Sequence, residues 1–151
     1  MSCSETIVED AAPTIEYKGY ELEKTATGFD SLLYINFDYG DKDGNLGLGT
    51  NDTMGAFKGF NNLNIKFFEK KNGIYIPMED AFGSVPDFSQ RIPNLTPTGK
   101  NKEIQGSMRV SFGVNSLEIA ADTLKFELYI VDRNFNESNR ISASDIVLLQ
   151  K

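Results

Sequence analysis

Residues 31–48 read SLLYINFDYGDKDGNLGL, and this stretch decides the fold. In its first half, Leu33, Ile35 and Phe37 alternate with more polar residues, so the apolar side chains share one face of an extended chain. Such a period of two predicts a β-strand with one face against a hydrophobic core. The second half is acidic and rich in glycine, which predicts that the strand ends in a turn.

The turn after this strand concentrates oxygen-bearing side chains within a few residues. The glycines between them let the backbone adopt positive φ angles and fold back on itself. A calcium ion takes about 6–8 oxygen ligands at about 2.3–2.6 Å, which a tight acidic loop can supply. The sequence therefore offers a candidate Ca²⁺ site, whose ligands would be Asp38, Asp41, Asp43, Asn45 and Asp52.

The alternative is a solvated turn without an ion, because Asp-Gly and Gly-Asn pairs form turns in any case. The pattern of an EF-hand loop is not met. With Gly44 at the sixth position of that pattern, the first position is Tyr39 and the twelfth is Thr50, where an EF-hand has a bidentate glutamate.

Size and charge limit the classes of function. The 151 residues suffice for one domain with a stable core, which we place at residues 13–151 after a flexible lead at residues 1–12. The net charge of −7 argues against nucleic-acid binding, which needs a basic surface. The chain has no apolar run near the roughly 20 residues of a membrane-spanning helix.

The residue types that are missing argue against most catalytic sites. The chain contains no histidine and a single cysteine, so neither a Ser-His nor a Cys-His nucleophile pair can form. A zinc site with histidine ligands is excluded for the same reason. We predict that the protein is not an enzyme. The alternative that stays open is a hydrolase that uses two carboxylates.

The single cysteine, Cys3, lies in the polar lead and is followed by Ser4 and Glu5. This start resembles a mature bacterial lipoprotein, in which the N-terminal cysteine carries the lipid. We expect Cys3 to be lipidated and the protein to lie in the cell envelope, facing the periplasm or the cell surface. The anchor would be its only contact with the membrane. The alternative is an incidental exposed cysteine.

Further alternating segments raise the number of expected strands to about seven, and no segment has a helical period. Gly19 interrupts the first strand and predicts a bulge. Asn72-Gly73 predicts a tight hairpin turn, and Pro77 marks the strand after it as an edge strand. These features predict an all-β fold, an antiparallel β-sandwich of the immunoglobulin or fibronectin type III kind.

Several aromatic residues lie between the expected strands. We predict that Phe57 and Phe60 pin the long connection after the acidic turn to the body of the domain. The alternative is that they form an aromatic binding platform. Phe82, Phe88 and Ile92 are predicted to cap one end of the core.

Three motifs carry a family resemblance: FDYGDKDGNLGL at 37–48, RIPNLTPTGKNKEIQG at 91–106 and FELYIVDRNFNESN at 126–139. They resemble a largely uncharacterised group of small cell-envelope lipoproteins of bacteria with an immunoglobulin-like domain. The acidic motif of that group reads D-G-D-G-D-[IL]-G, and here Asn45 takes the last acidic position. Residues 132–138 are similar to the D-x-x-G-N-x-S turn of extracellular sandwiches, with Phe135 in place of glycine.

The resemblance implies a fold and a location rather than a mechanism. We expect a non-enzymatic envelope lipoprotein that acts as an interaction or structural module, whose protein or glycan partner the sequence does not identify. The alternative is a calcium-stabilised module that binds a ligand such as a carbohydrate. In that alternative, Tyr75, Phe82 or Phe88 would stack on the sugar.

Overall fold

The computed structural model describes residues 12–49, 55–96, 103–114, 119 and 121–149 of the chain. Within these residues it contains seven β-strands and one turn of 3₁₀ helix, η1, at Gly55–Phe57. The strands are β1 (Thr14–Lys24), β2 (Asp30–Asp41), β3 (Leu63–Lys71), β4 (Ile74–Pro77), β5 (Ile104–Gly113), β6 (Thr123–Ile130) and β7 (Ile141–Val147).

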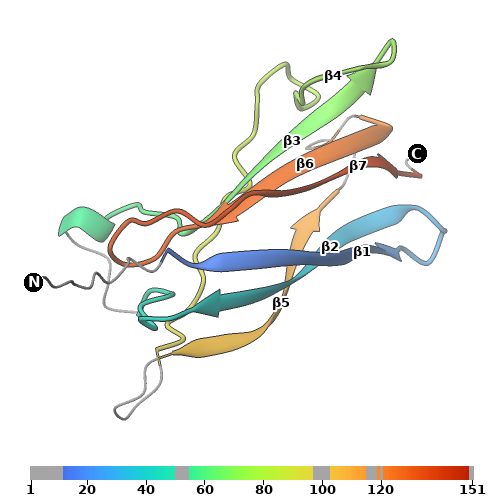
Figure 1. Cartoon of the computed structure of the whole chain (residues 1–151). Helices are drawn as coiled ribbons and strands as arrows, with labels where there is room; N and C mark the ends of the chain where they lie inside the picture. Colours follow the sequence, from blue (N-terminus) through green and yellow to red (C-terminus); the bar gives the residue numbers. More distant parts are fainter. Residues whose placement is uncertain (1–11, 50–54, 97–102, 115–118, 120, 150–151) are drawn as a thin grey trace, which may run out of the picture.

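The strands form two sheets that lie one above the other (Figure 1). One sheet has the order β1-β2-β5 and the other has the order β4-β3-β6-β7. Each of the five strand pairings is antiparallel. The prediction of an antiparallel β-sandwich with about seven strands is therefore confirmed. The separation of the first, second and fifth strands from the other four is that of a fibronectin type III-like domain.

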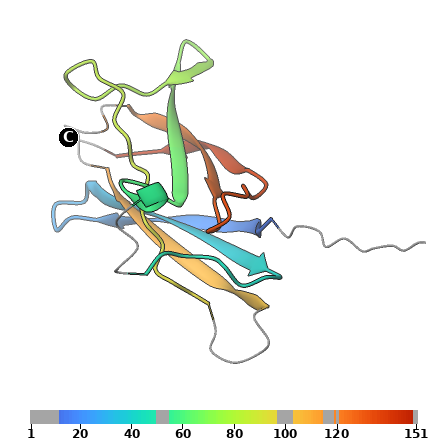
Figure 2. The same cartoon turned by 90° about the vertical axis from the view of Figure 1, so that its left-hand side faces the viewer.

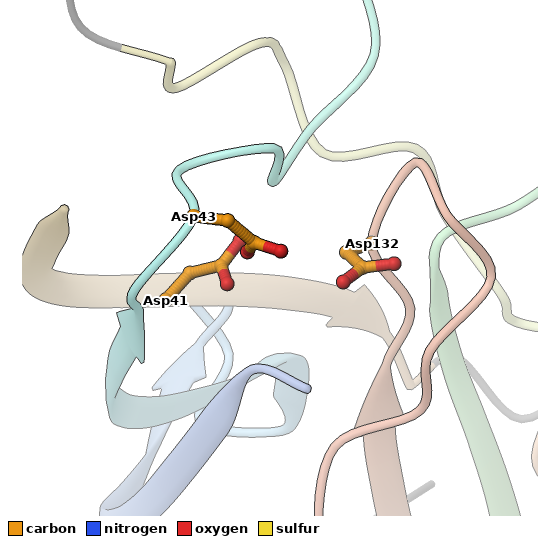
Figure 3. Close-up of side chains that lie close together, drawn as sticks. All are labelled: Asp41, Asp43 and Asp132. Carbon is orange, nitrogen blue, oxygen red and sulfur yellow. The ribbon is translucent and has the colours of Figure 1, made fainter. Parts of the chain in front are cut away.

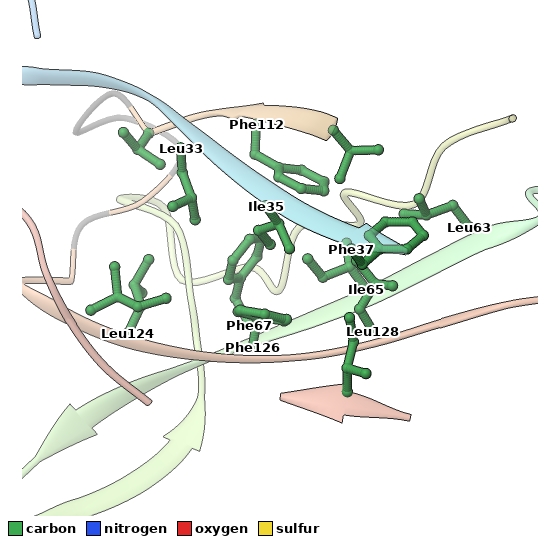
Figure 4. Packing of buried hydrophobic residues seen from close by; sticks show 14 of the residues in the cluster. Leu33, Ile35, Phe37, Leu63, Ile65, Phe67, Phe112, Leu124, Phe126 and Leu128 are labelled. Atoms are coloured by element: carbon green, nitrogen blue, oxygen red, sulfur yellow. The ribbon is translucent and has the colours of Figure 1, made fainter. Parts of the chain in front are cut away.

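The hydrophobic core lies between the two sheets and is built from alternate residues of each strand (Figure 4). The side chains of Leu33, Ile35 and Phe37 in β2 are fully buried, as the period of two predicts. Phe67 of β3 meets Phe112 of β5 edge to face across the interface, with ring centroids 5.6 Å apart. Burial of each such side chain contributes about 1.5–3 kcal/mol. The core therefore fixes the strand register, because a slip of one residue would turn these side chains to solvent.

The local predictions for turns and bulges are also confirmed. The pairing of β1 with β2 shifts between Tyr17 and Gly19, which is the expected bulge. Asn72 and Gly73 have φ angles of 53° and 79° and join β3 to β4 in a tight hairpin. Strand β4, which contains Pro77, lies at the edge of its sheet.

The aromatic predictions are only partly right. Ile92 is buried, and Phe88 packs against the core beside Phe67. Phe82 does not cap the core, because 82% of its surface is exposed. The Asp80 carboxylate accepts the backbone N–H groups of Phe82 and Ser84, so this loop closes on itself and directs Phe82 to solvent.

The acidic turn lies at one end of the sandwich. The end of β2, the loop between β6 and β7, and η1 all lie there, at the left of Figure 1. Figure 2 looks onto this end. The loop between β6 and β7 contacts both other segments here, through the rings of Phe135 and Phe57 and through the hydrogen bond from Arg133 to Asn45. Segments distant in sequence therefore meet at the acidic turn.

Candidate metal centre

Asp41 is the residue around which this end of the molecule is built. It is the last residue of β2 and shares the inward direction of Leu33, Ile35 and Phe37, because it lies an even number of residues after them. Its side chain is only 2% exposed. The chain turns directly after it, and Asp41 Oδ2 accepts the backbone N–H of Asn45 at 3.1 Å. This bond closes the acidic turn around a buried carboxylate.

A second buried carboxylate comes from the other sheet. Asp132 follows the end of β6 and is 1% exposed. Its Oδ1 accepts the backbone N–H groups of Asn134 and Asn136, both at 2.9 Å, so the carboxylate organises the loop at 132–138. The left-handed residue of this loop is Phe135, with φ at 65°, which occupies the position where the similar turn has glycine.

Asp41, Asp43 and Asp132 converge at this end of the sandwich (Figure 3). One oxygen from each carboxylate can be chosen so that all three lie within 4.8 Å of one another. Asp43 is exposed, whereas the other two are buried. Among the ion pairs found in the described residues, none involves these three carboxylates. The cluster thus concentrates negative charge without an ion pair among the described residues.

The side-chain amide of Asn45 lies among the three carboxylates. Its side-chain oxygen faces only acceptors, and its nitrogen faces only donors. Turning the amide over would place Nδ2 2.8 Å from Asp41 Oδ2 and 3.2 Å from both Asp43 Oδ1 and Asp132 Oδ2. An oxygen among three carboxylates is unfavourable unless a cation lies between them. Without a cation, the amide is satisfied with Nδ2 toward the carboxylates. A bound cation would instead favour the orientation with the side-chain oxygen toward it.

The second carboxylate oxygen of Asp41, Oδ1, is buried without a hydrogen-bond partner. Buried carboxylates are ordinarily paired or hydrogen-bonded. Burial raises the pKa of Asp41 to about 7, together with the hydrogen bond and charge of Asp43 and the charge of Asp132. Either a proton or a cation would relieve this carboxylate.

Arg133, the residue after Asp132, does not neutralise the cluster. Arg133 donates from Nη1 to the carbonyl oxygen of Gly47 at 2.9 Å and from Nη2 to Thr96 Oγ1 at 2.5 Å. Its backbone N–H donates to the carbonyl oxygen of Asn45 at 3.0 Å. Arg133 therefore holds the acidic turn and the segment around Thr96 to the loop while its charge is directed to neutral acceptors.

The structure places the predicted ligands in three groups. Asp41, Asp43 and Asn45 come together as expected. Asp38 does not join them: it lies on the outer face of β2, accepts a hydrogen bond from Ser107 Oγ at 2.7 Å and lies 3.6 Å from Lys18 Nζ. Asp52 lies outside the described residues, as does Cys3, so lipidation and an envelope location stay predictions.

Asp132 was missed by the sequence prediction. Its turn pattern at 132–138 was identified, but only as a turn. A usable signal was present, because the regular strand β6 ends two residues before Asp132, and the acidic turn also follows the end of a strand.

Comparison with known proteins gives no match to this chain, whether to a family model, a curated protein or a solved structure. In the part of the chain that the structure describes, no helix has the length and apolar character required to cross a membrane.

Proposed function

We propose that this protein is a calcium-binding β-sandwich module in which the ion fastens the two sheets together at one end. The observation that carries the proposal is the buried Asp41 Oδ1, which has no hydrogen-bond partner and lies within a cluster of three carboxylates. Asp41, Asp43, Asp132 and the Asn45 side-chain oxygen would be the protein ligands.

The donor set favours calcium over other metals. Every candidate ligand is an oxygen, which suits hard cations rather than zinc or copper. Calcium tolerates irregular geometry and a mixture of carboxylate, amide and water ligands, whereas magnesium demands a near-ideal octahedron. A cluster formed by two loops and the end of a strand fits the less demanding ion better.

The position of the site implies a structural effect. Asp41 ends a strand of the three-stranded sheet and Asp132 follows a strand of the four-stranded sheet. An ion held by both would join the sheets where Arg133 already donates hydrogen bonds to the carbonyl oxygens of Asn45 and Gly47. A cross-sheet ion of this kind supports a module that presents a rigid loop surface to a partner.

A thermal melt in calcium and in EDTA tests the proposal. At about 100 times its dissociation constant, a ligand stabilises the folded state by about 2.7 kcal/mol, which raises the melting temperature of a domain this size by roughly 5–10 °C. We expect such a rise for the wild type in calcium, a smaller rise in magnesium, and none for Asp41→Asn.

Asp38→Asn is the matched control, because Asp38 belongs to the same strand but lies outside the cluster. This variant should keep the full calcium response. Equal melting temperatures in calcium and EDTA for the wild type would overturn the proposal, and so would a response that survives in Asp41→Asn.

A further inference from the structure

We infer that the calcium site takes a neutral, hydroxyl-bearing ring as a ligand, a sugar bound through the ion and through Phe135. This inference rests on the proposed calcium site. It names the class of ligand that the remaining coordination positions and the neighbouring aromatic residues would accept.

The first step concerns the coordination of the ion. One oxygen from each of the three clustered carboxylates, with the Asn45 oxygen if its amide turns toward the ion, would give four protein ligands, whereas calcium takes about 6–8 oxygens. About two to four positions are therefore left for water or for the oxygens of a ligand. Asp43 is exposed, so the site opens to solvent on its side.

The second step concerns charge. Three carboxylates and one dication leave one net negative charge at the site. The whole chain is acidic as well, with a net charge of −7. An anionic ligand would meet repulsion from both, whereas neighbouring hydroxyl groups of a sugar can replace water on the ion without adding charge.

The third step concerns an aromatic cluster that includes a residue of the loop that supplies Asp132. The rings of Phe57, Phe60 and Phe135 lie together, with centroid distances of 6.0, 5.7 and 5.1 Å. None of the three belongs to the hydrophobic core or packs against it. Phe135 is 48% exposed and comes three residues after Asp132, in the loop that the Asp132 carboxylate organises. The Phe135 backbone N–H donates to the Asp132 carbonyl oxygen at 3.0 Å, so the ring belongs to the same tight loop as this proposed ligand. An exposed ring in that loop offers a flat apolar surface to the C–H face of a sugar.

The aromatic residues that the sequence suggested for this role are placed elsewhere. Tyr75 lies in β4, where its hydroxyl donates to Asp145 Oδ1 of β7 at 2.6 Å, and Phe88 is partly buried against the core. Phe82 is exposed, but it lies in the loop after β4 and not among the loops that form the ion site. Phe82 is therefore a suitable control residue.

The experiment is saturation-transfer-difference NMR on the full chain with D-glucose, D-galactose, D-mannose and L-fucose as probes, in calcium and in EDTA. The key variant is Phe135→Gly, because glycine readily adopts the positive φ angle of this position and the loop can keep its shape. Phe82→Ala is the control, and the calcium-dependent melting temperature is recorded for every variant.

We expect at least one sugar to give a signal in calcium that disappears in EDTA. The signal should fall at least five-fold in Phe135→Gly and persist in Phe82→Ala, while both variants keep the calcium-dependent rise in melting temperature. No signal from any probe, in a protein that calcium does stabilise, overturns this inference and leaves the ion site standing. A signal of equal strength in EDTA or in Phe135→Gly also overturns it. A wild type that calcium does not stabilise overturns the ion site and the inference with it.

Discussion

Asp41 occupies a position where the alternation of β2 would ordinarily place an apolar side chain. Burial and the neighbouring carboxylates raise its pKa from 3.8 to about 7. Between about pH 4 and pH 7, the folded protein therefore holds a proton that the unfolded chain has released. Because the folded state binds more protons in this window, its stability falls as the pH rises.

The pH dependence can be isolated by comparison with Asp41→Asn, whose amide resembles the protonated carboxyl and does not titrate. In EDTA, the free energy of unfolding of the wild type relative to this variant should fall as the pH rises from about 4 to about 7 and then level off. In calcium, the stabilisation of the wild type should grow over the same window, since the ion competes with the proton. Urea unfolding at a series of pH values measures both trends, and a relative stability that rises with pH in EDTA would contradict the assignment.

Because Asn45 is neutral, the only acidic side chains of the site among the residues that the structure describes are the three clustered carboxylates. Replacing Asn45 with aspartate would bring a fourth carboxylate to the three already within 4.8 Å of one another. We expect Asn45→Asp to lower the melting temperature in EDTA, because the added charge has no partner there. The rise on adding calcium should exceed that of the wild type, because ligand charge tunes calcium affinity. Calorimetry in both conditions tests this pair of effects, and a rise smaller than that of the wild type would argue that Asn45 is not a ligand.

Among the elements, the acidic turn is held in place by a close approach of two backbones. Leu48 forms a parallel bridge with Pro93, and Gly47 lies at the crossing with φ at 94°. A Cβ at Gly47 would lie 1.9 Å from the Pro93 carbonyl oxygen. Glycine is therefore required here both for its φ angle and for lack of space.

We expect Gly47→Ala to lower the free energy of unfolding by roughly 2–4 kcal/mol, since it adds a backbone collision to the strain of positive φ. Gly73→Ala is the matched control: Gly73 has φ at 79°, but a Cβ there would meet nothing within 4 Å. That variant should show only the cost of about 1–2 kcal/mol for a left-handed residue. Guanidinium unfolding compares the two, and equal losses would show that the contact with Pro93 is unimportant.

The elements also show which parts of the fold and site the sequence reveals. Strand β2 was predictable because one face is apolar and the other is not, and the same parity places Asp41 inward and Asp38 outward. The prediction overlooked this parity when it counted Asp38 as a ligand. The sequence could not show that Asp132 belongs to the same site as the acidic turn. Asp132 lies 91 positions after Asp41, and only the packing of the two sheets brings the two residues together. Phe57 and Phe60 contact Phe135 instead of the core for the same non-local reason.

In the whole molecule, β2 is tied to the opposite sheet near both of its ends. At its start, the Asp30 side chain is 1% exposed, accepts the backbone N–H of Leu149 at 2.7 Å and pairs with Lys24 at 2.8 Å. The Asp30 backbone N–H also donates to the carbonyl oxygen of Leu149 at 2.9 Å. At its far end, the Arg133 backbone N–H donates to the carbonyl oxygen of Asn45 at 3.0 Å, next to the proposed ion site of Asp41 and Asp132. The strand spans roughly 36 Å between Asp30 and Asp41 at about 3.3 Å per residue.

The two ties should therefore act independently. We expect Asp30→Ala to lower the free energy of unfolding by about 2–3 kcal/mol, because it removes a buried, charged acceptor from the backbone N–H of Leu149. The loss should be the same in calcium and EDTA, and the same in the Asp41→Asn background to within about 0.5 kcal/mol, since distant sites are additive. Glu16→Ala, at an exposed ion pair with Lys18, should cost less than about 1 kcal/mol. If Asp30→Ala instead weakened the calcium response, calcium binding would depend on the packing of the whole sandwich. The stabilisation by calcium could then not be assigned to a local link between the end of β2 and the loop after β6.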